Sequence, residues 1–276
     1  MEKIAAFGLV RGYPGHQAKW RYSQVVLRNY SILLQALIKR ESWDLILFHE
    51  GNISALDRKV LNFLALGQIK FVDVADTFRK PRELLHTGSY SPLGYALMCR
   101  FNYYGIWRHL VDYDVAMRVD EDCFLIRVPK LRGQKGFVTA ATCAETHTTT
   151  NNTLPLALEL SGDAHHYSHN FPYTNFYITN PKLWSEKPVQ EFLETVAKNP
   201  MCLEYRWGDI PVLGVALSKF SETLGPFKKD PSLIYLHLSH LTFVRQGNFK
   251  SARFVLDIKR PLHSVRSIFK SLTRTR

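Results

Sequence analysis

Two spacings of hydrophobic residues alternate along the first half of the chain. Short apolar runs typical of buried strands occur at residues 4–10, 44–49, 70–74 and 114–119. Apolar residues recur every three or four positions, as in amphipathic helices, at 20–39, 56–66 and 93–110. Strands that alternate with helices in this way predict an α/β fold, with a mixed, mostly parallel central sheet flanked by helices.

The pattern is less regular in the second half. Further strands are predicted at 136–142 and 233–238, and helices at 189–197 and 210–219. Residues 144–175 are rich in Thr, Asn, His and Pro, which predicts a long surface excursion near a site. No linker rich in Pro or Ser divides the chain, so we expect a single large domain over residues 1–260.

Composition excludes several classes of protein. The 276 residues include 36 Lys or Arg and 24 Asp or Glu, a net charge of +12, and 46% are hydrophobic, so a disordered chain is excluded. The apolar run at 4–10 stops at Arg11, which makes it too short for a membrane span and poorly built for a signal peptide. Four cysteines without metal-ligand spacing indicate free thiols in a reducing compartment. We therefore expect a cytoplasmic or membrane-peripheral protein.

Much of the basic excess lies at the C-terminus. Eight Lys or Arg lie between residues 250 and 276, against the single acid Asp257. From Pro261 onward apolar residues recur at helical spacing, which predicts a basic amphipathic tail over 261–276. Such a tail can lie on an anionic membrane surface, or it can pack on the protein's own core; the sequence leaves both open.

An acidic triplet, Asp120, Glu121 and Asp122, follows the strand predicted at 114–119. In an extended chain alternate side chains share a face, so Asp120 and Asp122 are expected to project together while Glu121 points away. Ligands of open α/β sheets bind beyond the carboxyl ends of the strands. Two carboxylates there suit Mn²⁺ or Mg²⁺ bridging a diphosphate, although a solvated turn has the same sequence.

The residues around this triplet resemble a known family. Residues 98–122, with Met-Cys-Arg-Phe at 98–101, resemble the fungal α-1,2-mannosyltransferases that extend mannoproteins from GDP-mannose. In the same order, residues 174–178 resemble the family's Ser-Asn-Phe-Glu-Ile, and 206–212 resemble its Arg-Trp-Gly-Asp-Ala-Pro-Val. The resemblance spans roughly residues 90–240.

The resemblance implies a GT-A glycosyltransferase fold and retaining transfer of mannose from GDP-mannose to a hydroxyl of a glycan or lipid-linked acceptor, with an α-1,2 linkage. Residues 1–122 are then the nucleotide-binding half, and 123–260 complete the acceptor and metal sites. Mn²⁺, or Mg²⁺, is expected on Asp120, Asp122 and a histidine near the last strand, where His240 is preferred to His237. The residues expected to bind the donor are Arg11, Arg100, Arg118, Asp120, Asn175 and Trp207.

The chain departs from the family where a carboxylate at the anomeric centre is expected. Tyr177 and Tyr205 stand at the family's two glutamate positions. The remaining candidates for catalysis are Glu204, Asp209 and Tyr177, although Asp209 is also placed to cap a helix. Without those glutamates, same-face attack in which the diphosphate deprotonates the acceptor is the more credible route.

Two alternative functions stay open, and a third is not expected. The donor can be another nucleotide-sugar, or the chain can be a non-catalytic relative that binds a glycan or nucleotide. Nucleic-acid binding is not expected, because no RNA- or DNA-binding fingerprint appears and a nucleic-acid reader has no use for Asp120 and Asp122 at the mouth of the sheet. The histidines at 165–169 are interpreted as part of a solvated loop.

Overall fold

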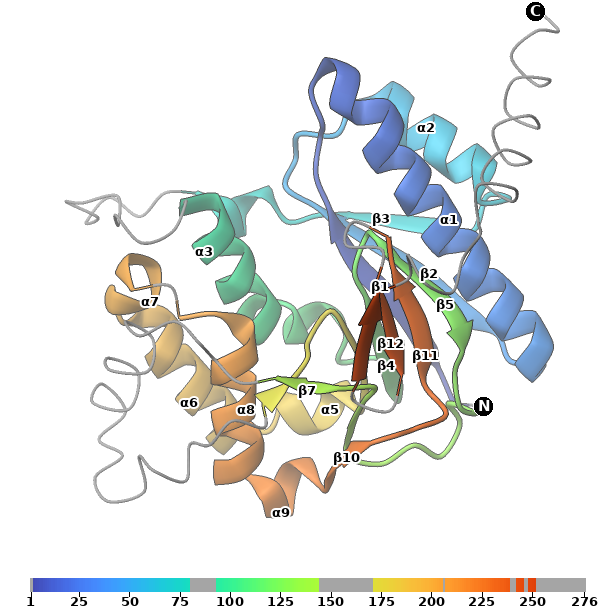
Figure 1. The fold of residues 1–276 in the computed structure, drawn as a ribbon. Coiled ribbons are helices and arrows are strands. Elements are labelled where there is room, and N and C mark those ends of the chain that lie inside the picture. Colours follow the sequence, from blue (N-terminus) through green and yellow to red (C-terminus); the bar gives the residue numbers. More distant parts are fainter. Residues whose placement is uncertain are drawn as a thin grey trace, which may run out of the picture.

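The computed structural model describes residues 2–79, 93–143, 171–205, 207–238, 242–245 and 248–251. A seven-stranded sheet forms the centre (Figure 1), in the order β10-β6-β9-β4-β1-β2-β3. Its strands are β1 (Ile4–Val10), β2 (Trp43–His49), β3 (Ile69–Asp73), β4 (Val115–Val119), β6 (Phe137–Thr139), β9 (Phe176–Thr179) and β10 (Phe227–Lys229). Every neighbouring pair is parallel except those of β9, which runs antiparallel to β4 and β6. The predicted mixed, mostly parallel sheet is confirmed.

Smaller sheets lie beside the central one. An antiparallel sheet has the order β13-β12-β11-β5, and β7 pairs with β8 in a two-stranded ribbon. The strands are β5 (Cys123–Arg127), β7 (Thr142–Cys143), β8 (Phe171–Pro172), β11 (Ile234–His237), β12 (Thr242–Arg245) and β13 (Asn248–Ser251). The four-stranded sheet joins β5, directly after β4, to the last described strands. β11 confirms the strand predicted at 233–238, whereas β5, β12 and β13 were not predicted.

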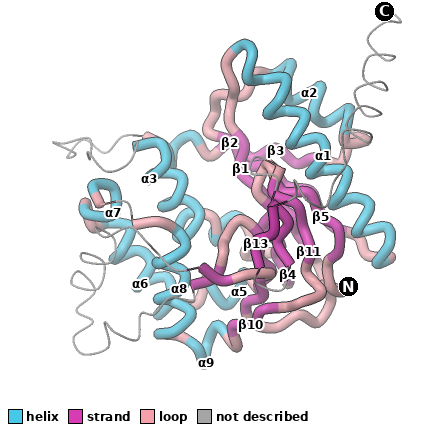
Figure 2. Tube along the Cα trace, in the orientation of Figure 1, coloured by secondary structure: helices cyan, strands magenta, loops and turns pink. Residues whose placement is uncertain are grey.

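Helices cover both faces of the central sheet (Figure 2). The helices are α1 (Gly15–Lys39), α2 (Ala55–Leu64), α3 (Leu93–Arg100), α5 (Pro181–Trp184), α6 (Lys187–Lys198), α7 (Met201–Glu204), α8 (Asp209–Lys219) and α9 (Ser221–Leu224). α1 ends where Arg40 takes the left-handed conformation, with φ 54°. The Ser54 hydroxyl caps α2 by accepting the Asp57 N–H at 3.0 Å.

Alternate residues of the central strands enter two separate cores. On β1, Ile4 and Ala6 pack into a core that also contains buried residues of α1, α2 and β5. The residues between them, Ala5 and Phe7, face the opposite core, which α3, α6 and α8 cover. Because both faces are buried, the strands appear in the sequence as continuous apolar runs rather than alternating ones.

Most predicted elements are confirmed to within a few residues, but the helix predicted at 93–110 is wrong in its second half. α3 ends at Arg100, a π turn follows at Phe101–Gly105, and a 3₁₀ turn at Trp107–His109. The irregular turns let the Trp107 ring stack on Trp184 with 4.7 Å between centroids, and this packing overrides the helical periodicity. The single strand predicted at 136–142 is also wrong, because β6 ends at residue 139 and β7 begins at 142.

In the described part of the chain, none of the helices has the length and apolar character needed to cross a membrane. The predicted C-terminal tail at 261–276 and the histidines at 165–169 lie outside the described residues.

Candidate donor and metal site

The acidic triplet forms the turn between β4 and β5. The Cys123 N–H donates to the Asp120 carbonyl at 3.0 Å, and the Asp120 N–H donates to the Asn175 carbonyl at 3.0 Å. The expectation that Asp120–Asp122 continues the strand is therefore wrong: the chain turns here because it leaves the central sheet for the four-stranded sheet. As a result Asp120 and Asp122 are held by different partners.

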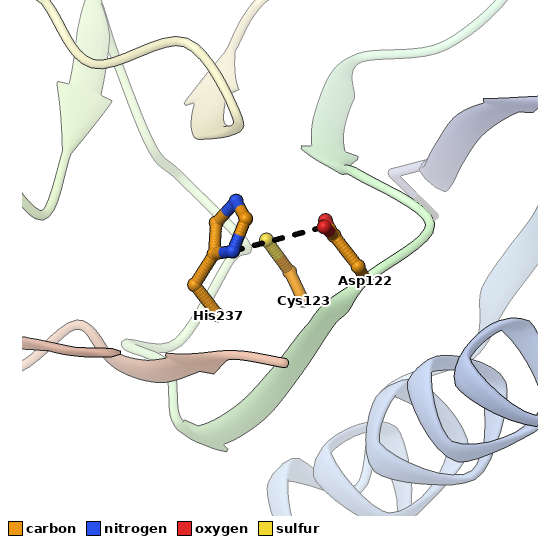
Figure 3. Close-up of side chains that lie close together, drawn as sticks. All are labelled: Asp122, Cys123 and His237. Atoms are coloured by element: carbon orange, nitrogen blue, oxygen red, sulfur yellow. Dashed lines mark ion pairs between the residues drawn. The ribbon is translucent and has the colours of Figure 1, made fainter. Parts of the chain in front are cut away.

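Asp122 lies beside His237 where the neighbouring strands β5 and β11 of the four-stranded sheet pair. The antiparallel pairing of β5 with β11 places His237 opposite Cys123, and the Leu238 N–H donates to the Asp122 carbonyl at 2.7 Å. His237 Nδ1 lies 3.7 Å from Asp122 Oδ2. Ligand atoms of Asp122, Cys123 and His237 all lie within 4.8 Å of one another, and Figure 3 shows the three side chains converging. Among the described residues, this is the group of ligand atoms close enough together that it could hold a metal ion.

The chemistry of this group suits a hard or borderline divalent cation. A carboxylate oxygen and an imidazole nitrogen are ligands that Mn²⁺ accepts, whereas a thiolate favours softer metals such as Zn²⁺. Cys123 is fully buried, and burial raises the pKa of its thiol. Its Sγ lies 3.8 Å from the Asn175 carbonyl oxygen, to which it donates. Asp122 and His237 are therefore the best candidate ligands; His240 lies outside the described residues.

Arg118 joins the end of β4 to the start of α8. Its Nε donates to Asp120 Oδ1 at 2.8 Å, and its Nη1 donates to Asp209 Oδ2. The Thr174 hydroxyl also donates to Asp209 Oδ2, at 3.2 Å. Asp209 makes no side-chain cap of its own helix, so its carboxylate serves this ion pair and not the capping role considered from the sequence. Burial raises the pKa of Asp120, and nearby carboxylates raise it further. The Arg118 guanidinium has the opposite effect and lowers it, but burial is the larger effect.

The Glu121 carboxylate contacts residues at and just before the start of α1. The Tyr13 hydroxyl donates to Glu121 Oε2, and Arg21 Nη1 lies 3.9 Å from Glu121 Oε1. The exposed Arg11 guanidinium lies over the Tyr13 ring at 5.6 Å from its centroid. Arg11 and Arg21 thus place positive charge beside the acidic turn.

A buried arginine on α1 binds the backbone just before the acidic turn. Arg28 is 0% exposed, and its Nε donates to the carbonyl of Val119, the last residue of β4, at 2.8 Å. Burial lowers its pKa to about 10, while the carboxylate of Asp120 acts in the opposite direction. Gly8 makes room for this contact, because a Cβ at that position would lie 2.6 Å from the Val119 carbonyl oxygen.

Comparison with solved structures decides which fold this is. The chain resembles core-mannan synthase A of Aspergillus fumigatus in a Mn/GDP form, with a TM-score of 0.68 and 15% identity over 86% of this chain and 75% of that one. It also resembles the mannosyltransferase Ktr4p of S. cerevisiae, with a TM-score of 0.63 and 15% identity over 86% and 70%. The chain has the GT-A glycosyltransferase fold.

A third similar GT-A structure is mouse xyloside xylosyltransferase 1 in its apo form, with a TM-score of 0.52 and 11% identity over 82% of this chain and 84% of that one. No model of a protein family matches the sequence, and no curated protein does. The likeness is therefore one of fold at low sequence identity.

Within the GT-A fold, one further predicted residue lies at the acidic turn. Asn175 is 7% exposed, and its Oδ1 accepts from the Tyr235 hydroxyl at 2.6 Å. Its Nδ2 is buried with no hydrogen-bond partner in the described part of the chain. An amide donor held this way beside Asp120 is suited to an acceptor oxygen of a ligand.

Other predicted residues lie away from the turn or beneath it. Tyr177 and Trp207 are 0% and 1% exposed and pack in the core, with Tyr177 under the Arg118 guanidinium at 5.9 Å. Arg100 donates through Nη2 to the Thr77 carbonyl at 3.2 Å. Glu204 ends α7, which packs against α3 and α6. The structure thus does not bring Arg100 or Glu204 to the acidic turn.

Sequence reasoning missed three residues at the site: Tyr13, Arg28 and Cys123. Arg28 was missed because a charged residue within a long amphipathic helix is usually solvated. Cys123 begins the apolar run that forms β5, and its position opposite His237 depends on the pairing of β5 with β11.

Proposed function

We propose that the chain is a metal-dependent glycosyltransferase that moves mannose from GDP-mannose to a hydroxyl of a glycan or lipid-linked acceptor. The observation that carries the proposal is the convergence of Asp122 and His237 at the carboxyl end of a central strand of a GT-A fold. The similar structures that are mannosyltransferases, one of them in a Mn/GDP form, support the choice of donor and metal.

In this proposal each polar group at the turn has a separate task. Asp122 and His237 would hold Mn²⁺ or Mg²⁺, which when bound offsets the charge that develops on the diphosphate leaving group. Arg118 keeps the Asp120 carboxylate fixed. Arg11 offers its exposed guanidinium to a phosphate, and Asn175 Nδ2 offers a buried donor.

The route we propose is retaining transfer by same-face attack. The acceptor oxygen forms the new bond to the anomeric carbon on the face from which the diphosphate oxygen departs, and the acceptor proton goes to that oxygen. The proposal assigns no nucleophile to the protein, since Tyr177 is buried, Asp209 is bound by Arg118 and Glu204 ends α7. An α-1,2 linkage is part of the proposal by resemblance to the fungal enzymes.

A second donor class keeps the same site. The chain also resembles a xylosyltransferase in fold, so another nucleotide-sugar is compatible with the same metal ligands. A non-catalytic relative that binds a glycan or nucleotide is favoured only by the tyrosines at positions 177 and 205.

The test is transfer from GDP-mannose to a simple mannoside, followed by NMR with and without Mn²⁺. We expect an α-linked product that needs the metal and falls at least about tenfold in Asp122→Asn, because the variant loses a ligand charge. Asp76→Asn is the matched control, because Asp76 is exposed and pairs only locally with Arg79. Equal turnover by wild type and Asp122→Asn would remove the metal role. Turnover of a different nucleotide-sugar would change the donor and keep the site.

A further inference from the structure

Exposed apolar side chains gather on two neighbouring helices. Of the twelve large hydrophobic side chains that are exposed among the described residues, nine lie on α1, on α2 or in the turn after α2. They are Trp20, Tyr30, Leu34, Leu37, Ile38, Leu56, Val60, Phe63 and Leu66. We call this surface the α1–α2 face. Leu37 is 75% exposed and Phe63 is 81% exposed, so these side chains are not covered by the core.

The nine residues belong to one side of the molecule. α1 and α2 contact each other and lie side by side (Figures 1 and 2). Both helices bury their inner residues, such as Val25 and Leu61, in the same core on the same face of the central sheet. The exposed residues Leu34 and Leu37 of α1 and Val60 and Phe63 of α2 are spaced by three and so share an outward stripe on each helix.

The charge around this apolar surface is almost entirely positive. α1 contains no Asp or Glu over its 25 residues, and α2 contains one, Asp57. The Asp57 carboxylate already accepts from the Ser54 hydroxyl at 2.7 Å. Exposed basic side chains on the same helices and at the end of α1 are Lys19, Arg40 and Lys59. An apolar centre with a basic rim is the composition of helices that lie in the headgroup region of an anionic bilayer.

We propose that the α1–α2 face binds the surface of an anionic lipid membrane. The apolar side chains would enter the acyl boundary, while the Lys and Arg side chains meet lipid phosphates. A second copy of the chain is a poorer occupant, because a two-fold contact would place these basic residues against one another without acids to offset them. Anionic headgroups supply the charge that this face lacks.

The position of the candidate site is consistent with this orientation. α1 begins four residues after Arg11, and Arg21 of α1 reaches Glu121 of the acidic turn. The candidate site therefore lies near the N-terminal end of the α1–α2 face. The proposal goes beyond the transferase function and does not depend on it, because membrane binding is measured without donor or acceptor.

The experiment is co-sedimentation of the full chain with vesicles. Vesicles of phosphatidylcholine alone are compared with vesicles of equal parts phosphatidylcholine and phosphatidylglycerol. We expect binding to the anionic vesicles that weakens with added salt. The double variant Leu37→Ser/Phe63→Ser should bind at least about tenfold more weakly, because two exposed apolar side chains no longer enter the lipid. Lys59→Glu should weaken binding to anionic vesicles at least about fivefold.

The control is Val111→Ser, which removes an apolar side chain of 44% exposure outside the α1–α2 face and should bind like wild type. Unchanged thermal unfolding of each variant shows that the fold is intact. Failure of the wild type to bind anionic vesicles would overturn the proposal. So would unchanged binding by Leu37→Ser/Phe63→Ser, which would assign attachment to another segment such as the basic residues after 250. Light scattering that shows a dimer dissociated by the same variant would instead make this face an interface between copies.

Discussion

Replacing Arg118 by Met keeps an unbranched aliphatic stem but removes the guanidinium, and with it the cation of a buried ion pair. The side chains of Arg118 and Asp209 are 6% and 8% exposed. Removing one partner of such a pair leaves an uncompensated buried charge and costs about 3–5 kcal/mol. The Thr174 hydroxyl still donates to Asp209 at 3.2 Å, so we expect a loss near the lower end, about 3 kcal/mol. For a chain of this size the loss corresponds to a fall in melting temperature of roughly 6 °C or more.

The assay is thermal and urea unfolding of Arg118→Met, Asp209→Asn and the double variant. In Arg118→Met the buried Asp209 carboxylate has lost its cation, and the penalty is the cost of that uncompensated charge. The double variant removes the orphaned charge and should recover more than about half of the loss. A single variant within about 1 °C of wild type, or a double variant no more stable than Arg118→Met, would refute the reasoning.

Three further outcomes follow from the geometry. Gly8→Ala should cost about 1–3 kcal/mol in urea unfolding, because its Cβ would lie 2.6 Å from the Val119 carbonyl oxygen; wild-type stability would contradict this contact. Burial lowers the pKa of His49, so the folded protein resists protonation of this side chain. As the pH is lowered below about 6.5, the melting temperature of wild type should therefore decrease more than that of His49→Gln. Parallel plots of melting temperature against pH for the two proteins would count against this. The hydrogen bond from Lys182 lowers the pKa of Asp114, so Asp114→Asn should lose less than about 1 kcal/mol at neutral pH. That difference should vanish as pH falls below about 3.9 in an acid titration of stability, and a pH-independent difference would exclude the charge as its cause.

The elements that the sequence predicts well are those in which burial alone decides the structure. The apolar runs that form β1 and β2 and the long amphipathic pattern of α1 need no distant partner to be recognised. The π turn at Phe101–Gly105 was not predicted, because it depends on where Trp107 meets Trp184, more than seventy residues away. Four-residue strands such as β9 carry too short a pattern to be distinguished from a buried turn.

The placement of the acidic triplet could be predicted, but its partners could not. The acids do follow β4 at the carboxyl end of a central strand, whereas their role in a site stays a prediction. Which histidine faces Asp122 depends on the antiparallel register of β5 with β11, which spacing along the chain cannot supply. The orientation of Asp120 was missed for a related reason, since Arg118 draws its carboxylate toward the Asp209 ion pair.

The central claim is that the acidic turn and His237 form a metal-dependent nucleotide site. Calorimetric titration of GDP, UDP and GDP-mannose into wild type, Asp122→Ala and His237→Ala, with and without Mn²⁺, tests it most directly. The account predicts GDP and GDP-mannose binding that requires Mn²⁺ and weakens at least about tenfold in both variants, while Asp76→Ala binds like wild type. GDP binding of equal strength without Mn²⁺ and in both variants would contradict it.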